Sequence, residues 1–410
     1  MSVETKVFGM KPESGRWVFV LLGFLINLCL GSVYAYSVFK KPVEKMFSVK
    51  GLASNLPFMI FLAFFAVTMF FGGRLMKKFG PKMVAIIGGS IVGLGWILSF
   101  YATDIVFLTV TYGVIAGSGV GLIYGCPIAI AANWFPDRKG FAVGLTVAGF
   151  GGSPFITAYV AKRLIDAYGA NTTFLYMGLA FLVLTVILSL PLRLPSTGWK
   201  PAGWAPAAAA ATSVDMDTNA MIKTGAFWGI LLCFMFGSLA GLMAIGISST
   251  VGTEIIKIDP VFAASLVGIF AIFNGLGRPL FGIIIDKFSS KTAMIINLTI
   301  ILLMSIGMLS AVEGSVWLFI ICFVGFWMCL GGWLAIAPTT TAAFFGMKNY
   351  ANNYGIVFMA YGIGAILGGL ISGQAKDVFG SYTLAFYPTA GLALLGIVLT
   401  LILIKQPVKK

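Results

Sequence analysis

The sequence predicts an all-α membrane protein with twelve transmembrane helices in two pseudo-symmetric six-helix halves. First, 59% of its 410 residues are apolar and only 10% are charged, whereas a soluble domain carries about 25% charge. Second, apolar runs of roughly 20 residues, enough to cross a bilayer, recur along the chain. Third, segments of the first half have similar counterparts in the second half. Together these observations exclude an ordinary soluble fold.

Apolar runs separated by polar breaks define the expected helices. The predicted spans are 17–39, 53–75, 83–101, 106–132, 141–165, 173–192, 225–250, 261–284, 293–311, 315–341, 352–375 and 382–404. The sixth and seventh are separated by a stretch rich in Pro, Ala, Ser and Thr, which is typical of a linker. We therefore expect a first half at 1–193, a linker at 194–223 and a second half at 224–410.

The basic residues orient the predicted spans. With the N-terminus in the cytoplasm, 18 Lys and Arg residues fall on the cytoplasmic side and eight on the outside, which leaves one of the 27 unassigned. Cytoplasmic loops carry an excess of Lys and Arg. We therefore expect both termini and the linker in the cytoplasm. The first apolar run is too long for the core of a cleavable signal peptide and is expected to remain as the first span.

Two pairs of segments indicate a duplication. The segment from Phe71 aligns with that from Phe281 after a one-residue gap, so that Phe79 matches Phe288 at an offset of 209. The segment 134–144 aligns with 345–355 at an offset of 211. Each lies at the cytoplasmic end of the second or fourth span of its half. Duplicated halves are typical of carriers that alternate access to a site near the membrane midplane.

The composition also excludes several function classes. The net charge is +14, but the basic residues lie between apolar runs and form no stripe for nucleic acid. The chain contains no histidine, the commonest general base and metal ligand. An enzyme active site within the membrane, a metal site and a cofactor are therefore not expected.

One arginine stands apart from all other charges. The 13 acidic residues lie at span ends or in loops, and among the basic residues only Arg278 lies well inside a predicted span. It is eight residues from Asp286, hence about 12 Å along the helix. An arginine there costs at least about 2.5–3.5 kcal/mol to insert. One interpretation is that backbone carbonyls and water accept the hydrogen bonds of this guanidinium. We favour a binding site for an anion from solution, because the planar guanidinium binds a carboxylate through two parallel hydrogen bonds.

Several polar side chains are candidates for the same site. Asn274 lies one helical turn before Arg278, and Pro279 is expected to remove a helix hydrogen bond and kink the span beside it. The aromatic candidates at similar depth are Tyr34, Tyr36, Tyr124 and Tyr361. For each tyrosine, packing and ligand contact are both open interpretations.

The segments 134–154 (WFPDRKGFAVGLTVAGFGGSP), 31–47 (GSVYAYSVFKKPVEKMF) and 273–288 (FNGLGRPLFGIIIDKF) resemble the fifth, first and eighth helices of the monocarboxylate transporters and the oxalate:formate antiporters. Both belong to the major facilitator superfamily. The resemblance implies the major facilitator fold and a bacterial inner-membrane location. It also places Arg278 on the arginine that binds the substrate carboxylate in both families.

The departures from these families are informative. Animal monocarboxylate carriers have Asp at the position of Asn274 and Lys at the position aligned with Tyr34. The oxalate carrier has a second cation where this chain has Tyr361. The superfamily's loop motif has Asp where this chain has Lys77, while the second-half copy keeps Asp286. The residues assigned to gating and loop motifs are Asp286, Lys287, Lys77, Asp137 and Arg138.

A single buried cation favours a substrate with one negative charge, since a second carboxylate would remain unpaired in a low-dielectric site. The expected ligands are therefore a small monocarboxylate of the lactate or pyruvate type and a proton, with membrane lipid around the helices. Proton symport is the first hypothesis, and anion exchange of the oxalate:formate type is the alternative. The oligomeric state is left open.

Overall fold

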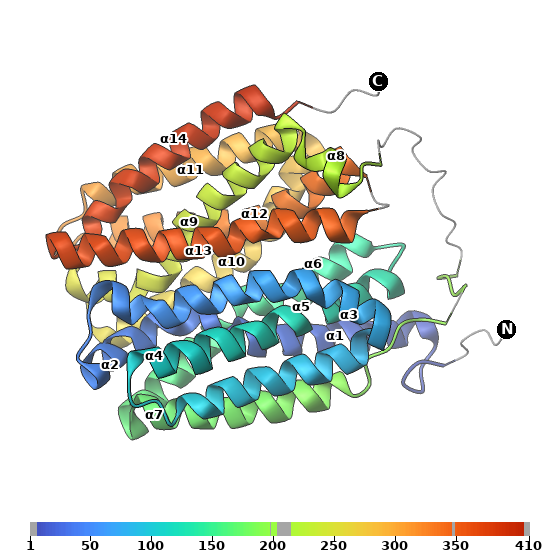
Figure 1. The fold of residues 1–410 in the computed structure, drawn as a ribbon, viewed down its shortest axis with the longest axis horizontal. Coiled ribbons are helices and arrows are strands. Elements are labelled where there is room, and N and C mark those ends of the chain that lie inside the picture. Colours follow the sequence, from blue (N-terminus) through green and yellow to red (C-terminus); the bar gives the residue numbers. More distant parts are fainter. Residues whose placement is uncertain (1–5, 197, 203–214, 347–348, 406–410) are drawn as a thin grey trace.

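The computed structural model describes residues 6–196, 198–202, 215–346 and 349–405, and they are helical almost throughout. Figure 1 shows the blue-to-green helices of the first half beside the yellow-to-red helices of the second. The start of α1 and the end of α14 lie at one end of the bundle, here called the terminal end. The other end is called the opposite end.

The first half contains nine helical segments. They are α1 (Pro12–Leu30), η1 (Gly31–Ala35), α2 (Tyr36–Phe47), α3 (Gly51–Ser99), α4 (Ile105–Leu108), η2 (Thr109–Ala116), α5 (Gly117–Trp134), α6 (Lys139–Gly152) and α7 (Pro154–Ser189).

The second half follows the short helix α8 (Thr218–Ile222). Its segments are α9 (Gly225–Glu254), α10 (Pro260–Lys287), α11 (Ser290–Leu309), α12 (Val316–Phe345), α13 (Tyr350–Phe379), η3 (Tyr382–Ala385) and α14 (Phe386–Leu403).

Two helical stretches cross the membrane twice each. The described residues form ten apolar stretches long enough to span a bilayer, and two of these contain 49 residues. A straight helix of that length would extend about 74 Å, far beyond a hydrocarbon core of about 30 Å. Each has a glycine in its middle with a positive φ, Gly80 at 79° and Gly169 at 79°. The described residues therefore make twelve crossings, and the predicted fold class is confirmed.

Contacts on either side of Gly80 confirm the reversal of α3. A Cβ atom on Gly72 would lie 3.2 Å from the Gly121 carbonyl oxygen, and one on Gly88 would lie 2.9 Å from that of Gly119. Residues sixteen apart in α3 thus contact residues two apart in α5, as the two limbs of a hairpin do.

The first crossing differs from its prediction. It runs from Pro12 to Phe47 and includes the 3-10 turn η1, whereas the sequence predicted 17–39. Lys40 was therefore expected in an outside loop, and this expectation was wrong. It lies in α2 with no exposed surface, and its Nζ is 4.5 Å from the centroid of the Tyr382 ring. Arg278 is not the only cation buried within a crossing.

One ion pair and one hydrogen bond join the two halves at the opposite end, and a second ion pair lies within the second half. Glu254 of α9 contacts Lys41 of α2 at 3.6 Å and Lys376 of α13 at 2.6 Å. The Leu52 backbone N–H at the start of α3 donates to Asp377 Oδ2 of α13 at 3.0 Å. The first and second halves are therefore in close contact at this end.

The segment between the halves is attached at both ends. The Trp134 side chain donates to the Arg193 carbonyl at 2.9 Å, and Trp134 packs on Trp199 at 4.9 Å between ring centroids. The Met216 backbone N–H donates to the Phe345 carbonyl at 3.0 Å. Residues 197 and 203–214 of the predicted linker lie outside the described residues.

Candidate substrate site

Arg278 lies where α10 of the second half meets α6 of the first. Its side chain is 5% exposed, and Nη1 donates to the Val147 carbonyl oxygen of α6 at 2.6 Å. Nε and Nη2 are buried and have no hydrogen-bond partner among the described residues. One backbone carbonyl thus satisfies part of the guanidinium, as the alternative interpretation supposed. Nε and Nη2 of the guanidinium remain available to another hydrogen-bond acceptor.

Asn274 lies one turn away on the buried side of α10. Its Nδ2 donates to the Trp327 carbonyl of α12 at 2.9 Å, and its Oδ1 has no hydrogen-bond partner in the described chain. A Cβ atom on Gly151 would lie 2.6 Å from this Oδ1. The glycine therefore permits the close approach of α6 to α10. The Asn274 donor is already engaged, so the amide is less available to a ligand than the sequence suggested.

Pro279 does not interrupt α10. The helix is continuous from Pro260 to Lys287, and Pro279 lies inside it. A proline with helical φ removes one hydrogen bond without leaving the helical region, so the helix continues through it and the expected kink stays a prediction. The carbonyl that loses this bond belongs to Gly275, one turn before the proline, close to Asn274.

Three of the four predicted tyrosines gather near Arg278. The Tyr34 and Tyr361 hydroxyls form a hydrogen bond of 2.6 Å that joins the first crossing to α13. Tyr124 of α5 packs edge-on against Phe150, which also contacts Tyr34. The three hydroxyls lie within the electrostatic reach of the Arg278 charge, and that of Tyr124 is also close enough to interact with the guanidinium as a hydrogen-bonding group. These side chains therefore form a polar cluster within an aromatic surround.

Tyr36 belongs to a different cluster. Its hydroxyl donates to the Ser54 carbonyl at 2.8 Å, and its ring packs against Phe58 and Tyr112. Two residues along a helix turn a side chain by about 200°, so Tyr34 and Tyr36 face different neighbours. We therefore correct the sequence prediction: the structure does not bring Tyr36 to Arg278.

Sequence reasoning missed an aromatic row on α13. Tyr350, Tyr354, Phe358 and Tyr361 contact one another in succession, with centroid distances of 5.6, 5.7 and 5.0 Å; the first and last pairs are stacked and the middle pair meets edge to face. Arg278 also acts on the Tyr354 hydroxyl. The spacing of four, four and three residues follows one helix face. That pattern was visible in the sequence and could have identified Tyr354.

The predicted gating residues are dispersed. Lys77, Asp286, Lys287 and Arg138 are exposed at the terminal end. Asp137 instead forms an ion pair with Arg16, with hydrogen bonds of 2.6 and 2.8 Å to its two oxygens.

Arg16 itself lies in α1 with 6% exposure, although the sequence placed it before the first span. It also lies 4.3 Å from the centroid of the Phe135 ring. The hydrogen bonds from Arg16 lower the pKa of the Asp137 carboxyl, because they favour its ionised form. The pair connects α1 to the loop between α5 and α6.

The family profile of the Major Facilitator Superfamily matches residues 20–343 and, in a second match, 239–410. The chain belongs to the Major Facilitator Superfamily. Among solved structures, the superfamily member described as a D-xylose-proton symporter superposes with a TM-score of 0.73 at 16% identity, over 95% of this chain and 98% of that one. At this identity the similarity supports the fold alone.

Relatives in sequence include transporters of small carboxylates. The oxalate:formate antiporter of Oxalobacter formigenes is 27% identical over 402 residues, which cover 96% of this chain and 94% of the relative. Monocarboxylate transporter 14 of Homo sapiens is 25% identical, over 94% and 90% of the two chains. This superfamily member is therefore an integral membrane transporter.

Proposed function

We propose that the protein is a secondary transporter of small monocarboxylates, of the lactate or pyruvate type, which moves its substrate together with a proton by alternating access. The observation that carries the proposal is the buried guanidinium of Arg278, whose Nε and Nη2 have no acceptor among the described residues. A carboxylate supplies two acceptors in the matching planar geometry.

The position of Arg278 fits a site that both halves share. Its guanidinium is held by α6 of the first half through the Val147 carbonyl, while its backbone belongs to α10. Tyr34 and Tyr361 make a second contact between the halves close by. We propose that the halves 1–193 and 224–410 tilt about these contacts, with both termini in the cytoplasm of a bacterial cell. Lys77, Asp286, Lys287 and Arg138 then remain candidates for the cytoplasmic gate.

Net uptake of an anion favours proton coupling. Each negative charge carried inward against the membrane potential costs about 2.3 kcal/mol per 100 mV, and arginine cannot release its own proton. A proton that travels with the substrate cancels this charge. Water, the tyrosine hydroxyls, or acids such as Glu254 and Asp259 are the candidate carriers.

Anion exchange is the second candidate. Asn274 stands where the animal carriers have Asp, so no carboxyl group lies one turn from Arg278. The oxalate:formate antiporter is among the relatives. In exchange, Arg278 is paired with an anion each time the carrier changes conformation, in both directions, and no proton is needed.

Proteoliposomes separate the two mechanisms. Vesicles without internal substrate are given labelled lactate and an inward proton gradient. Symport predicts accumulation that collapses with a protonophore, whereas exchange predicts uptake only into vesicles preloaded with anion. Failure of lactate, pyruvate, formate and oxalate to be transported in either format would overturn the proposed substrate class.

A further inference from the structure

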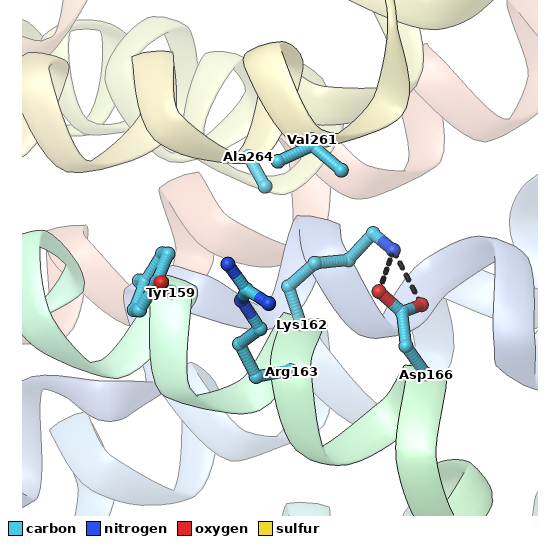
Figure 2. A pocket seen from close by; sticks show the side chains of 6 residues that line it. All are labelled: Tyr159, Lys162, Arg163, Asp166, Val261 and Ala264. Atoms are coloured by element: carbon cyan, nitrogen blue, oxygen red, sulfur yellow. Dashed lines mark hydrogen bonds and ion pairs between the residues drawn. The ribbon is translucent and has the colours of Figure 1, made fainter.

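A pocket opens between α7 and α10 at the opposite end of the bundle. Figure 2 shows four side chains of α7 below it and two of α10 above it. Its volume is about 140 Å³, and it is lined by Tyr159, Lys162, Arg163, Asp166, Val261 and Ala264. Ala264 precedes Arg278 by 14 residues, hence about 21 Å along α10. The pocket is therefore separate from the candidate substrate site.

The charges in this pocket leave one cation unpaired. The Lys162 ammonium is bonded to the Asp166 carboxylate. The Arg163 guanidinium lies over the Tyr159 ring, 5.2 Å from its centroid, and pairs with no acid among the described residues. Asp259, just before α10, accepts from the backbone N–H groups of its own helix. Arg163 therefore presents free donors beneath Val261 and Ala264.

The surface around the pocket is apolar on both helices. Phe155 and Ile156 of α7 are 57% and 48% exposed, and Val261 and Phe262 of α10 are 47% and 44% exposed. In a membrane-spanning chain, such side chains face lipid acyl chains. Tyr159 is typical of the boundary between hydrocarbon and water. The Arg163 guanidinium thus lies beside the lipid-facing surface.

We propose that this pocket binds the phosphate headgroup of an anionic phospholipid. The guanidinium fork matches the phosphate oxygens, and the apolar surfaces beside it receive the acyl chains. A free anion would use Arg163 but would gain nothing from these surfaces. Because α7 and α10 belong to different halves, the bound headgroup contacts both. It therefore favours the conformation in which the opposite end is closed.

The test uses the full chain in nanodiscs with a photoactivatable phosphatidylglycerol. Cross-linked peptides of α7 and α10 are quantified by mass spectrometry for wild type, Arg163→Gln and Arg163→Lys. The matched control is Arg74→Gln, since Arg74 also lies over an aromatic ring, 4.6 Å from the Phe70 centroid, outside this pocket. We expect Arg163→Gln to lower labelling at least about tenfold, Arg163→Lys to lower it less, and Arg74→Gln to leave it unchanged.

Three results would overturn the proposal. One is equal labelling of the α7 and α10 peptides in wild type and Arg163→Gln, with thermal denaturation showing that the variant is folded. The second is that phosphatidylcholine labels as strongly as phosphatidylglycerol. The third is that millimolar inorganic phosphate displaces the lipid. In either case the site would not select an anionic lipid. Transport is not needed for either readout, so the lipid assignment stands or falls separately from the proposed substrate.

Discussion

Arg278 and Lys40 are both buried basic side chains at contacts between the two halves, but their surroundings differ. Arg278 lies within electrostatic reach of tyrosine hydroxyls and donates to a backbone carbonyl, and no carboxylate pairs with it in the described part of the chain. The Lys40 Nζ also has no hydrogen-bond partner in the described chain, but it lies within the electrostatic reach of Glu44, Glu254 and Asp377, as well as Lys376. A buried cation thus indicates a ligand site only where the protein supplies no opposing charge. Lys40 instead belongs to the closed contact at the opposite end.

The largest effect is expected at Arg278. Arg278→Gln removes the charge, and Arg278→Lys keeps it but loses the two parallel hydrogen bonds. We expect either variant to lower lactate uptake in proteoliposomes at least about 100-fold, while expression and thermal denaturation change little. Near-normal uptake by Arg278→Gln would remove the basis for the proposed binding site.

A smaller effect of a different kind is expected at Lys40. Lys40→Met keeps an unbranched apolar stem but removes the Nζ group among the three acids. We expect turnover to fall about tenfold, because the balance between closed and open states changes, while KM stays within about twofold. A large rise in KM would contradict the contrast between Lys40 and Arg278, since Lys40 would then contact the substrate.

Tyr361 tests whether a second cation can be added to the site. The hydroxyl of Tyr361 lies 2.6 Å from that of Tyr34, so Tyr361→Lys places an amine beside Tyr34, within the electrostatic reach of Arg278. We expect oxalate to compete about fivefold better against labelled lactate, because a second cation can pair the second carboxylate. Tyr361→Phe is the matched control, and it should not favour oxalate. Unchanged competition in Tyr361→Lys would argue against this position as a charge selector.

The smallest effect is expected from the ion pair between Arg16 and Asp137. The pKa of Asp137 is lowered in the folded protein, so its stabilisation is present above the ordinary pKa of about 4 and is lost as pH falls through the lowered pKa. We expect Asp137→Asn to lower Tm by about 1–3 °C at pH 7. The difference from wild type should narrow as the pH falls below about 4. A difference that is the same at both pH values would assign the effect to packing instead of charge.

Much of the fold could be predicted because bilayer thickness limits the possibilities. The lengths of the apolar runs and the polar breaks around Gly80 and Gly169 were sufficient to identify two crossings where each helical stretch of 49 residues appears continuous. The duplicated segments also pointed to a two-half carrier, which the family comparison supports. Arg278 could be singled out because an isolated charge inside an apolar run is costly.

The tertiary structure decided which charges and rings meet. Lys40 precedes a Lys-Pro pair at the end of an apolar run and resembles a loop residue in sequence, but α2 continues and buries it against Tyr382. Tyr34 and Tyr36 are equivalent in composition and depth, yet only Tyr34 reaches Tyr361, because helix rotation turns them toward different neighbours. Local sequence determines where the chain crosses the membrane, because an apolar run long enough to span the bilayer must form a helix there. Contacts between residues more than 300 positions apart depend instead on how the two halves pack.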